Sequence, residues 1–531
     1  MTDNRASKTR AGVQIPLVAR LALGASLVLL VLSGAVPLPW HTSQHDAPRA
    51  PLQGKPVLPL PDEEGAIARL SKILTFPTVA NPQAEDHVGA EAALHFKNQH
   101  KWLAEAFPRV WKALKVENVG AGGWSRLLTW QGTDASLRPL LLLSHLDVVP
   151  PGDVGAWEPA GPFSGEVRDG YVFGRGALDV KSGVTGILEA VSALLHEGFR
   201  PARTVMIAFG HDEEVGGGLG AVRIAEVLKQ RGLEFEMVLD EGGMVFHEGV
   251  KGLSKVPTGM VGVAEKGYAT VDVEVSHPGG HAAMPPTDGT SIAELLAAIV
   301  DRVGREPPTA VLTKPTAEML THLAHVAPWH LRPVLSRAAR SQWLGTLTAS
   351  ALGAKGPDTA AVVRTTMAPT RVNVGVADNV LPGNGTATFN VRILPGSTIE
   401  GVLRHLEVVA RAATRGRGNV AVRLRPGTHT SAGSGVADPY APPFDAVRRA
   451  ALETLDHSGT LVMAPYLVVG ATDARHYEDV APGRCLRFTP FVLRPHETSL
   501  LHSSNERIAT DVYLDAVRFY VRFIQIMSAG V

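Results

Sequence analysis

The chain has 531 residues, more than one hydrophobic core usually holds, so two or more domains are expected. Hydrophobic residues make up 45% and charged residues 19%, a composition typical of globular rather than disordered chains. Lys plus Arg and Asp plus Glu both number 51, and this balance argues against a nucleic-acid-binding protein, which needs an excess of basic groups. The single cysteine, Cys485, excludes an internal disulfide and any zinc site built on paired thiolates.

The N-terminus combines basic residues with an apolar run, the pattern of an exported or membrane-inserted segment. Arg5, Lys8 and Arg10 precede a mostly apolar stretch from Leu21 to Val36. Its length lies between that of a signal peptide and that of a membrane anchor, so residues 1–36 are predicted to be one or the other. Flanking positive charges keep the N-terminus in the cytoplasm. The rest of the chain is therefore expected on the non-cytoplasmic side, secreted or attached to the membrane.

A proline-rich segment follows. Residues 37–62 contain seven prolines, which exclude a helix or a central strand and indicate a stiff linker. The folded part of the chain is expected to begin near residue 63.

Short apolar runs that end in polar clusters dominate the next part of the chain. The runs over 139–143, 204–209 and 235–239 end in histidine or acidic residues, and the stretch 174–179 leads into an expected helix over 181–197. Continuous apolar strands separated by helical patterns predict an α/β fold with a mostly parallel sheet buried on both faces. Sites in such sheets gather at the carboxyl ends of the strands, where all four clusters are expected to lie.

Around Gly267 the pattern changes to the alternation of a half-exposed antiparallel strand. The later elements are expected as a helix over 292–303, strands over 371–376 and 386–393, a helix over 400–413 and a strand over 420–424. The order β-α-β-β-α-β predicts an inserted ferredoxin-like α+β unit. We expect catalytic parts at 63–266 and 430–531, with the insert at 267–429. Residues 307–370 of the insert are mostly helical and carry no assigned motif.

Together the clusters supply two imidazoles and three carboxylates, from His145, Asp179, Glu214, either Asp240 or Glu241, and His502. This nitrogen and oxygen set suits Zn²⁺, with Mn²⁺ or Co²⁺ as alternatives. Five protein ligands suit a pair of ions that share one carboxylate and hold a water between them.

Four motifs carry a family resemblance: Ser-His-Leu-Asp-Val-Val-Pro (144–150), Gly-Arg-Gly-Ala-Leu-Asp-Val-Lys-Ser-Gly (174–183), Gly-His-Asp-Glu-Glu-Val-Gly-Gly (210–217) and His-Ser-Ser-Asn-Glu-Arg-Ile (502–508). They resemble the co-catalytic zinc metallopeptidase family of carboxypeptidase S, aminoacylase, glutamate carboxypeptidases and N-acyl-amino-acid hydrolases. The match runs from about residue 60 to the C-terminus, in order. The N-terminal segment and the long insert make the carboxypeptidase S branch the most similar.

The resemblance implies a role for each residue at the metal centre. His145 and Asp179 would hold one zinc, with Asp179 bridging to a second zinc completed by Glu214 and His502. For the fifth ligand we prefer Asp240, the first residue off the expected strand, over Glu241. Two further roles are expected: Asp147 would accept the second N–H of His145, and Glu213 would be the general base.

The resemblance also implies substrate contacts outside the metal centre. His281, in Gly-Gly-His-Ala-Ala-Met-Pro (279–285), would reach across a homodimer and stabilise the oxyanion. Asn379 and Arg392 would hold the carboxylate of the substrate, a task that suits a guanidinium fork. Thr472, in Gly-Ala-Thr-Asp (470–473), matches a substrate-side loop in a supporting role.

The leading functional hypothesis is a two-zinc enzyme that cuts an amide bond next to the free C-terminal carboxylate of a short peptide. An N-acyl-amino-acid hydrolase is the alternative, because the same site serves both and only the pocket for the acyl side would differ. That pocket could be shaped by residues 307–370, whose leucines and tryptophans could admit a fatty chain. A non-catalytic binding protein is a remote alternative, since such a chain should have lost Glu213 or a ligand.

Overall fold

The computed structural model of the protein describes residues 59–158 and 160–528. The predicted signal or anchor segment, and all of the predicted linker except residues 59–62, lie outside these ranges. Within the described ranges, no helix is both long enough and apolar enough to cross a membrane.

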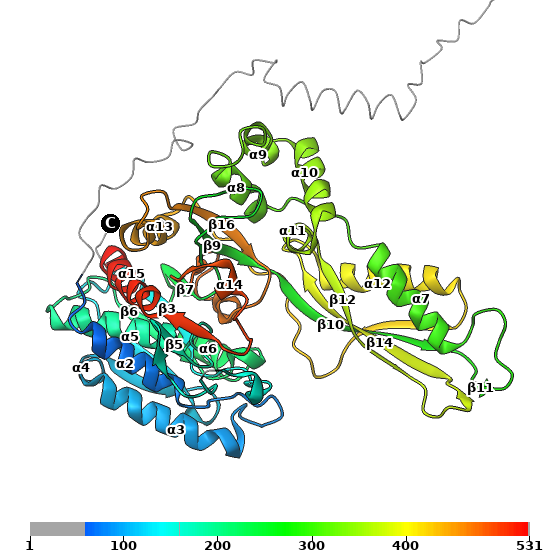
Figure 1. Ribbon diagram of the computed structural model, residues 1–531, viewed down its shortest axis with the longest axis horizontal. Helices are drawn as coiled ribbons and strands as arrows, with labels where there is room; N and C mark the ends of the chain where they lie inside the picture. The colour runs from blue at the N-terminus through cyan, green and yellow to red at the C-terminus, as the bar shows by residue number, and fades with distance from the viewer. Residues whose placement is uncertain (1–58, 159, 529–531) are drawn as a thin grey trace, which may run out of the picture.

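A large mixed sheet forms the centre of the catalytic part (Figure 1). Its strands are β1 (Lys115–Val119), β2 (Ser125–Trp130), β3 (Leu140–His145), β6 (Val205–Gly210), β7 (Met237–Asp240), β8 (Val245–Phe246), β9 (Thr258–Glu265), β16 (Val462–Val468), β17 (Cys485–Arg487) and β18 (Val492–Leu493). Strand β3 pairs in parallel with β6 and β7, and β17 continues in parallel with β7. The central strands are thus parallel, as predicted, whereas β1 and β2 add antiparallel pairs at one edge.

Helices cover both faces of this sheet, which explains why its strands are continuous apolar runs. Leu140 and Leu142 of β3 pack in one hydrophobic core, whereas Leu141 and Leu143 pack in a second core on the opposite face. The helices are α2 (Glu63–Leu74), α3 (Gly89–Ala106), α4 (Pro108–Ala113), α5 (Lys181–His196), α6 (Ala221–Gln230), α13 (Pro442–Thr454), α14 (Pro495–Thr498) and α15 (Thr510–Ser528). Helices α5 and α15 contribute to the first core and α6 to the second.

A second, small sheet contains β4 (Val167–Arg168), β5 (Tyr171–Phe173) and β19 (Arg507–Ala509). The loop of residues 174–179 follows β5, so it does not extend a strand of the large sheet as expected. Pairing between β5 and β19 places this loop beside the C-terminal motif at 502–508.

The inserted unit has its own sheet and core. Its elements are β10 (Gly267–Ser276), α7 (Ile292–Arg305), β12 (Thr366–Val374), β14 (Asn384–Ile393), α12 (Ile399–Thr414) and β15 (Asn419–Leu424). The strand order β12-β14-β10-β15, antiparallel throughout, is the ferredoxin-like arrangement that the sequence predicts. A two-stranded ribbon of β11 (Gly280–His281) and β13 (Val380–Leu381) lies at the end of this unit remote from the large sheet (Figure 1).

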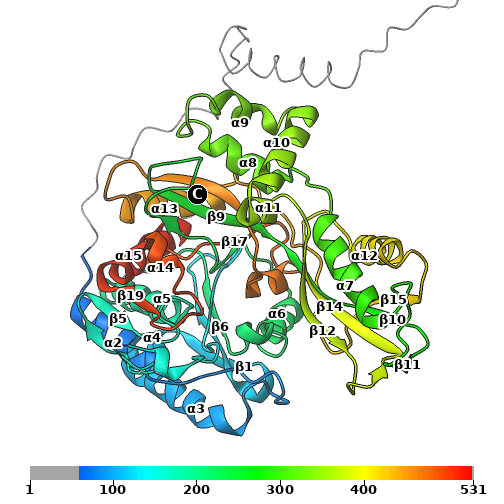
Figure 2. The same cartoon turned by 45° about the vertical axis from the view of Figure 1, so that its right-hand side comes forward.

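Four helices between α7 and β12 form a separate layer: α8 (Lys314–Leu323), α9 (Arg332–Ala338), α10 (Gln342–Lys355) and α11 (Pro357–Ala361). Leu320 and Leu323 of α8 pack with Met260 of β9 and Ala464 of β16. This segment therefore packs on the large sheet, although the sequence placed it within the insert. Figure 2 shows α8, α9 and α10 above the sheet, on the side away from α3.

Candidate metal centre

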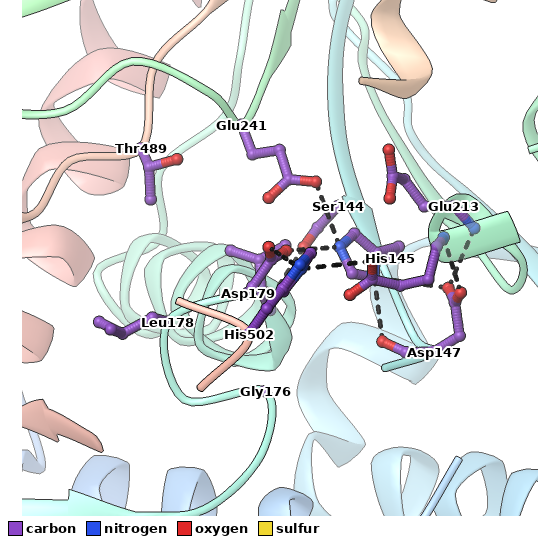
Figure 3. A network of polar contacts seen from close by, with 12 residues as sticks. Ser144, His145, Asp147, Gly176, Leu178, Asp179, Glu213, Glu241, Thr489 and His502 are labelled. Atoms are coloured by element: carbon purple, nitrogen blue, oxygen red, sulfur yellow. Dashed lines mark hydrogen bonds and ion pairs between the residues drawn. The ribbon is translucent and has the colours of Figure 1, made fainter. Parts of the chain in front are cut away.

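His145 ends strand β3 and directs its imidazole at two carboxylates (Figure 3). Its Nε2 atom lies 3.1 Å from Asp179 Oδ1 and 3.1 Å from Glu241 Oε1. Its Nδ1 atom lies 3.0 Å from the backbone carbonyl oxygen of Asp147, which can only accept a hydrogen bond. Nδ1 therefore carries a proton, so Nε2 is the ring nitrogen left to bind a cation that the two carboxylates would hold.

Asp179 joins a second group through its other oxygen. Asp179 Oδ2 lies 2.9 Å from His502 Nε2, which in turn lies 3.4 Å from Glu214 Oε2. One imidazole and two carboxylates thus gather twice, each time close enough to share one cation. Because Asp179 gives one oxygen to each group, its carboxylate lies where a bridging ligand would.

The structure corrects the preference for Asp240 over Glu241. Asp240 is still part of strand β7, and its oxygens accept hydrogen bonds from the backbone N–H groups of Glu241 and Ala474 at 2.9 and 2.6 Å. Successive residues of a strand point to opposite sides. The side chain that faces His145 is therefore that of Glu241. Asp240 was expected to be the first residue after the strand, but it is the last residue of the strand.

Asp147 is buried and holds the turn that carries two acidic residues. Its carboxylate oxygens accept hydrogen bonds from the backbone N–H groups of Glu213 and Glu214 at 3.2 and 3.0 Å. Asp147 Oδ1 lies 3.4 Å from His145 Nδ1, farther than the carbonyl oxygen of the same residue. The expected carboxylate partner of His145 thus acts mainly through its backbone, and its side chain positions Glu213 and Glu214.

The Glu213 side chain lies beside His145 (Figure 3). Within residues 59–158 and 160–528, its carboxylate has no hydrogen bond or ion pair. Burial, reinforced by the charges of Glu241 and Asp473, raises the pKa of Glu213 well above its usual value. A carboxylate of raised basicity without a protein partner can take up and return a proton.

The pKa shifts within the two groups of His, Asp and Glu side chains are those expected where a cation binds. Burial and the charge of Asp179 raise the pKa of Glu241 to about 8, and Glu214 Oε1 is buried without a hydrogen-bond partner. Hydrogen bonds to Asp179 and Glu214 raise the pKa of His502 to about 10. Such crowded carboxylates are stabilised by positive charge, and nitrogen and oxygen donors without thiolates suit Zn²⁺, Mn²⁺ or Co²⁺.

Glu506 and Arg175 hold the Asp179 loop, and the sequence reasoning assigned them no role. One oxygen of the buried Glu506 carboxylate accepts hydrogen bonds from the backbone N–H groups of Gly176, Leu178 and Asp179 at 3.1, 2.7 and 3.2 Å. Its other oxygen accepts from Arg175 at 2.5 Å. Arg175 lies in the motif at 174–183 and Glu506 in the motif at 502–508. Each is a charged residue of a motif to which no ligand role was assigned, and this is the signal that could have identified them.

His281 and Asn379 lie on the far ribbon of the inserted unit, not in the metal centre of this chain. Both are exposed, and the backbone carbonyl oxygen of Asn379 accepts from the N–H of Ala282 at 3.1 Å. His281 Nδ1 accepts a hydrogen bond from the N–H of Ala283 at 3.1 Å. The proton of this imidazole is therefore on Nε2, which leaves an N–H donor of the kind an oxyanion needs.

Arg392 lies at the opposite end of the unit from Asn379. Its guanidinium stacks over the ring of Tyr268 with 4.9 Å to the ring centroid, and no carboxylate forms an ion pair with it in the described chain. Burial lowers the pKa of Arg392, and the nearby Arg475 adds to this effect. Arg475 donates a hydrogen bond to the carbonyl oxygen of Gly216, which follows the turn of residues 213–215.

Thr472 is buried, and its hydroxyl is already in use. Its Oγ1 and backbone N–H both donate to Glu265 Oε2 at 3.0 Å. Thr472 therefore helps to fix its loop, and its hydroxyl proton is not free to bind a substrate, although its oxygen can still accept a hydrogen bond.

The comparison with protein families agrees with the residues gathered here. The model of peptidase family M20/M25/M40 matches residues 141–526. The chain belongs to this family. It is a hydrolytic enzyme, as the motifs imply, and the family is typically metal-dependent.

The relatives fall into two named groups. The chain is 34% identical over 471 residues to N-fatty-acyl-amino acid synthase/hydrolase PM20D1.1 of Danio rerio, covering 88% of this chain and 87% of that protein. It is 32% identical over 459 residues to probable carboxypeptidase S-like 2 of Dictyostelium discoideum, covering 86% and 84%. Both the peptidase and the acyl-amino-acid hypotheses fit these relatives.

Solved structures support the fold. The M20 family metallo-carboxypeptidase Sso-CP2 from Sulfolobus solfataricus aligns with a TM-score of 0.60 at 16% identity, over 88% of this chain and 99% of that one. Human carnosine dipeptidase 1 aligns with a TM-score of 0.59 at 16% identity, over 88% and 97%.

Proposed function

We propose that the protein is a two-zinc hydrolase that cleaves the amide bond next to a free carboxylate. The observation that carries this proposal is the doubled donor set around Asp179, with the unpartnered Glu213 beside it. The amino-acid side of the substrate would be common to both groups of relatives. The acyl side would be a second amino acid in a short peptide or a fatty acid in an N-acyl amino acid.

Each residue of the centre has a distinct task in this proposal. His145, Asp179 and Glu241 would hold one zinc, and Asp179, Glu214 and His502 the other. Bound zinc lowers the pKa of a water from about 15.7 to about 7 and polarises the carbonyl oxygen. Glu213 takes the proton of the attacking water and delivers it to the leaving nitrogen. Asp147 and Glu506 act through backbone N–H groups, which keep Glu213, Glu214 and Asp179 in place.

One assay tests the reaction and distinguishes the two acyl classes. Zinc-loaded protein is offered a Gly-Leu dipeptide and an N-oleoyl amino acid, and free amino acid is measured. We expect release from at least one of them, and none from a Glu213→Gln preparation treated in the same way. Release from neither would contradict the proposal, whereas the ratio of the two kcat/KM values assigns the acyl side.

Metal content tests the ligand assignment. Elemental analysis of the purified protein is expected to find close to two zinc ions per chain. Glu241→Gln should lower this number to about one, because a ligand of one group is lost. Asp240→Asn is the matched control and should keep both ions, since the carboxylate oxygens of Asp240 accept from backbone N–H groups. Loss of zinc from Asp240→Asn, with full zinc in Glu241→Gln and native circular dichroism in both, would reverse the assignment.

A homodimer is part of the proposal, because His281 is exposed on a ribbon remote from the metal centre of its own chain. If His281 serves the partner's centre, a mixed dimer of His281→Ala and Glu213→Gln subunits has one intact site. Random pairing then restores about a quarter of wild-type activity on co-expression, although each variant alone is nearly inactive. Activity no higher than the mean of the two variants would show that His281 does not act across subunits.

We also propose that the catalytic part lies on the non-cytoplasmic side, secreted or attached to the membrane through residues 1–36. The support is the basic and apolar pattern of the N-terminus. Protease added to intact cells should digest or release the catalytic part, and complete protection would contradict this topology.

A further inference from the structure

The helical layer of α8 to α11 exposes large apolar side chains. Trp343 and Leu347 on α10 are 57% and 47% exposed, and Trp329 in the loop before α9 is 71% exposed. Trp343 and Leu347 are four residues apart, so they lie on one face of α10. They line an open hollow together with Ser341, Gln342, Thr346 and Ser350, none of which is charged. Large apolar side chains gathered at a surface indicate an interaction site.

The stretch between Glu318 of α8 and Asp358 of α11 carries charges of one sign only. Residues 319–357 contain no aspartate or glutamate, in a chain with 51 acidic residues. The same range holds Arg332, Arg337, Arg340 and Lys355. Lys355, at the end of α10, is the only charged residue of that helix. The partner of this surface should therefore be apolar and negatively charged.

We propose that α10 and the Trp329 loop dock on an anionic lipid bilayer. Tryptophan is enriched at bilayer interfaces, because its ring is apolar and its N–H group is polar. Each Lys or Arg near an anionic bilayer strengthens binding by about fivefold. A second copy of the chain is the weaker occupant, because a symmetric contact would place the same cations of both copies against one another.

The N-terminal sequence is compatible with this orientation. The apolar run from Leu21 to Val36 is expected at the membrane, and residues 37–58 separate it from the described chain. A proline-rich spacer of this length reaches up to about 70 Å, at about 3.1 Å per residue. Such a tether lets α10 meet the bilayer. Docking there would present the enzyme to amphiphilic substrates, but the inference holds whichever acyl group is cleaved.

Quenching of tryptophan fluorescence by brominated lipids tests the proposal on the full chain. The protein is reconstituted in brominated phosphatidylcholine vesicles with or without phosphatidylglycerol. We expect more quenching in the anionic than in the zwitterionic vesicles. This excess should fall in Trp343→Phe, which keeps Trp329, and disappear in Leu347→Asp. The matched control is Trp111→Phe on α4, which lies on the other side of the molecule and should leave the quenching unchanged (Figure 1). Unaltered circular dichroism, and unaltered hydrolysis of whichever soluble substrate the wild type cleaves, show that each variant is folded.

Three results would overturn the inference. The first is equal quenching of the wild type and Trp343→Phe. The second is equal quenching in anionic and purely zwitterionic vesicles. The third is an oligomer that Leu347→Asp dissociates in sedimentation velocity without any change in quenching, which would assign the surface to a second copy.

Discussion

Replacing Glu213 with glutamine is expected to lower kcat by at least about 10²-fold, the lower end of what general acid–base catalysis contributes. The half-buried Glu213 side chain lies beside His145 (Figure 3), and its carboxylate has no protein partner in the described chain, so it is free to take up a proton. Glutamine keeps the shape of the side chain but cannot take up a proton. Because Glu213 belongs to neither ligand group, the variant should retain its zinc, and KM should change little.

Glu214→Gln is the matched control, since it changes the neighbouring residue by the same atom. Glu214 Oε2 lies 3.4 Å from His502 Nε2, within the second ligand group. This variant should lose zinc as well as activity, and added zinc should restore part of the activity. Equal zinc loss in both variants would mean that Glu213 and Glu214 are not divided into base and ligand.

The fold was largely predictable because the apolar residues of each strand or helix follow the regular spacing of its buried face. Strand β3 is apolar at every position from Leu140 to Leu143, since both faces of the sheet are covered. The insert was predictable from its alternation and element order. The packing of α8 on β9 and β16 was not, because an amphipathic helix indicates which face is buried and not which neighbour buries it.

The side chains that gather in the centre were predictable, except where the prediction depends on the exact residue at which a strand ends. His145 follows an apolar run that is unambiguous, whereas Asp240 and Glu241 are adjacent acids at the end of β7. Only the end of the strand decides which of them faces the metal centre. The hydrogen bond from Ala474 to Asp240 comes from a segment 234 residues away in the sequence, so no local pattern reveals it.

The residues expected to bind the substrate carboxylate show a different limit of prediction from the sequence. Asn379 and Arg392 were expected to act together, yet β14 (Asn384–Ile393) runs the length of the inserted sheet between them. Within one chain they therefore lie at opposite ends of the unit. If Asn379 contacts a substrate, it does so beside His281 in a partner's centre, whereas Arg392 lies on the body of the sheet, near Arg475 of its own chain. The mixed-dimer experiment tests the first assignment through His281.

Amidation of the substrate carboxylate is expected to lower kcat/KM by about 10- to 150-fold. This range corresponds to about 1.5–3 kcal/mol for a charge-assisted hydrogen bond, and Arg392 is the group proposed to make it. Its guanidinium is half-buried over Tyr268 and has no protein carboxylate as a partner in the described chain, so it remains available to a substrate anion.

In Arg392→Ala the discrimination between free and amidated substrates should largely disappear, because the group that binds the charge is gone. Arg392→Lys should restore only part of it, since an ammonium group cannot make two parallel hydrogen bonds or stack in the same way on Tyr268. Arg423→Ala on strand β15 of the same sheet is the control, because Arg423 pairs with Glu274 and should leave the discrimination intact. If the wild type cleaves free and amidated substrates equally well, the enzyme does not bind the substrate carboxylate. The same two-metal centre would then serve an aminopeptidase, for which a free amino group on the other side of the amide bond is the determinant.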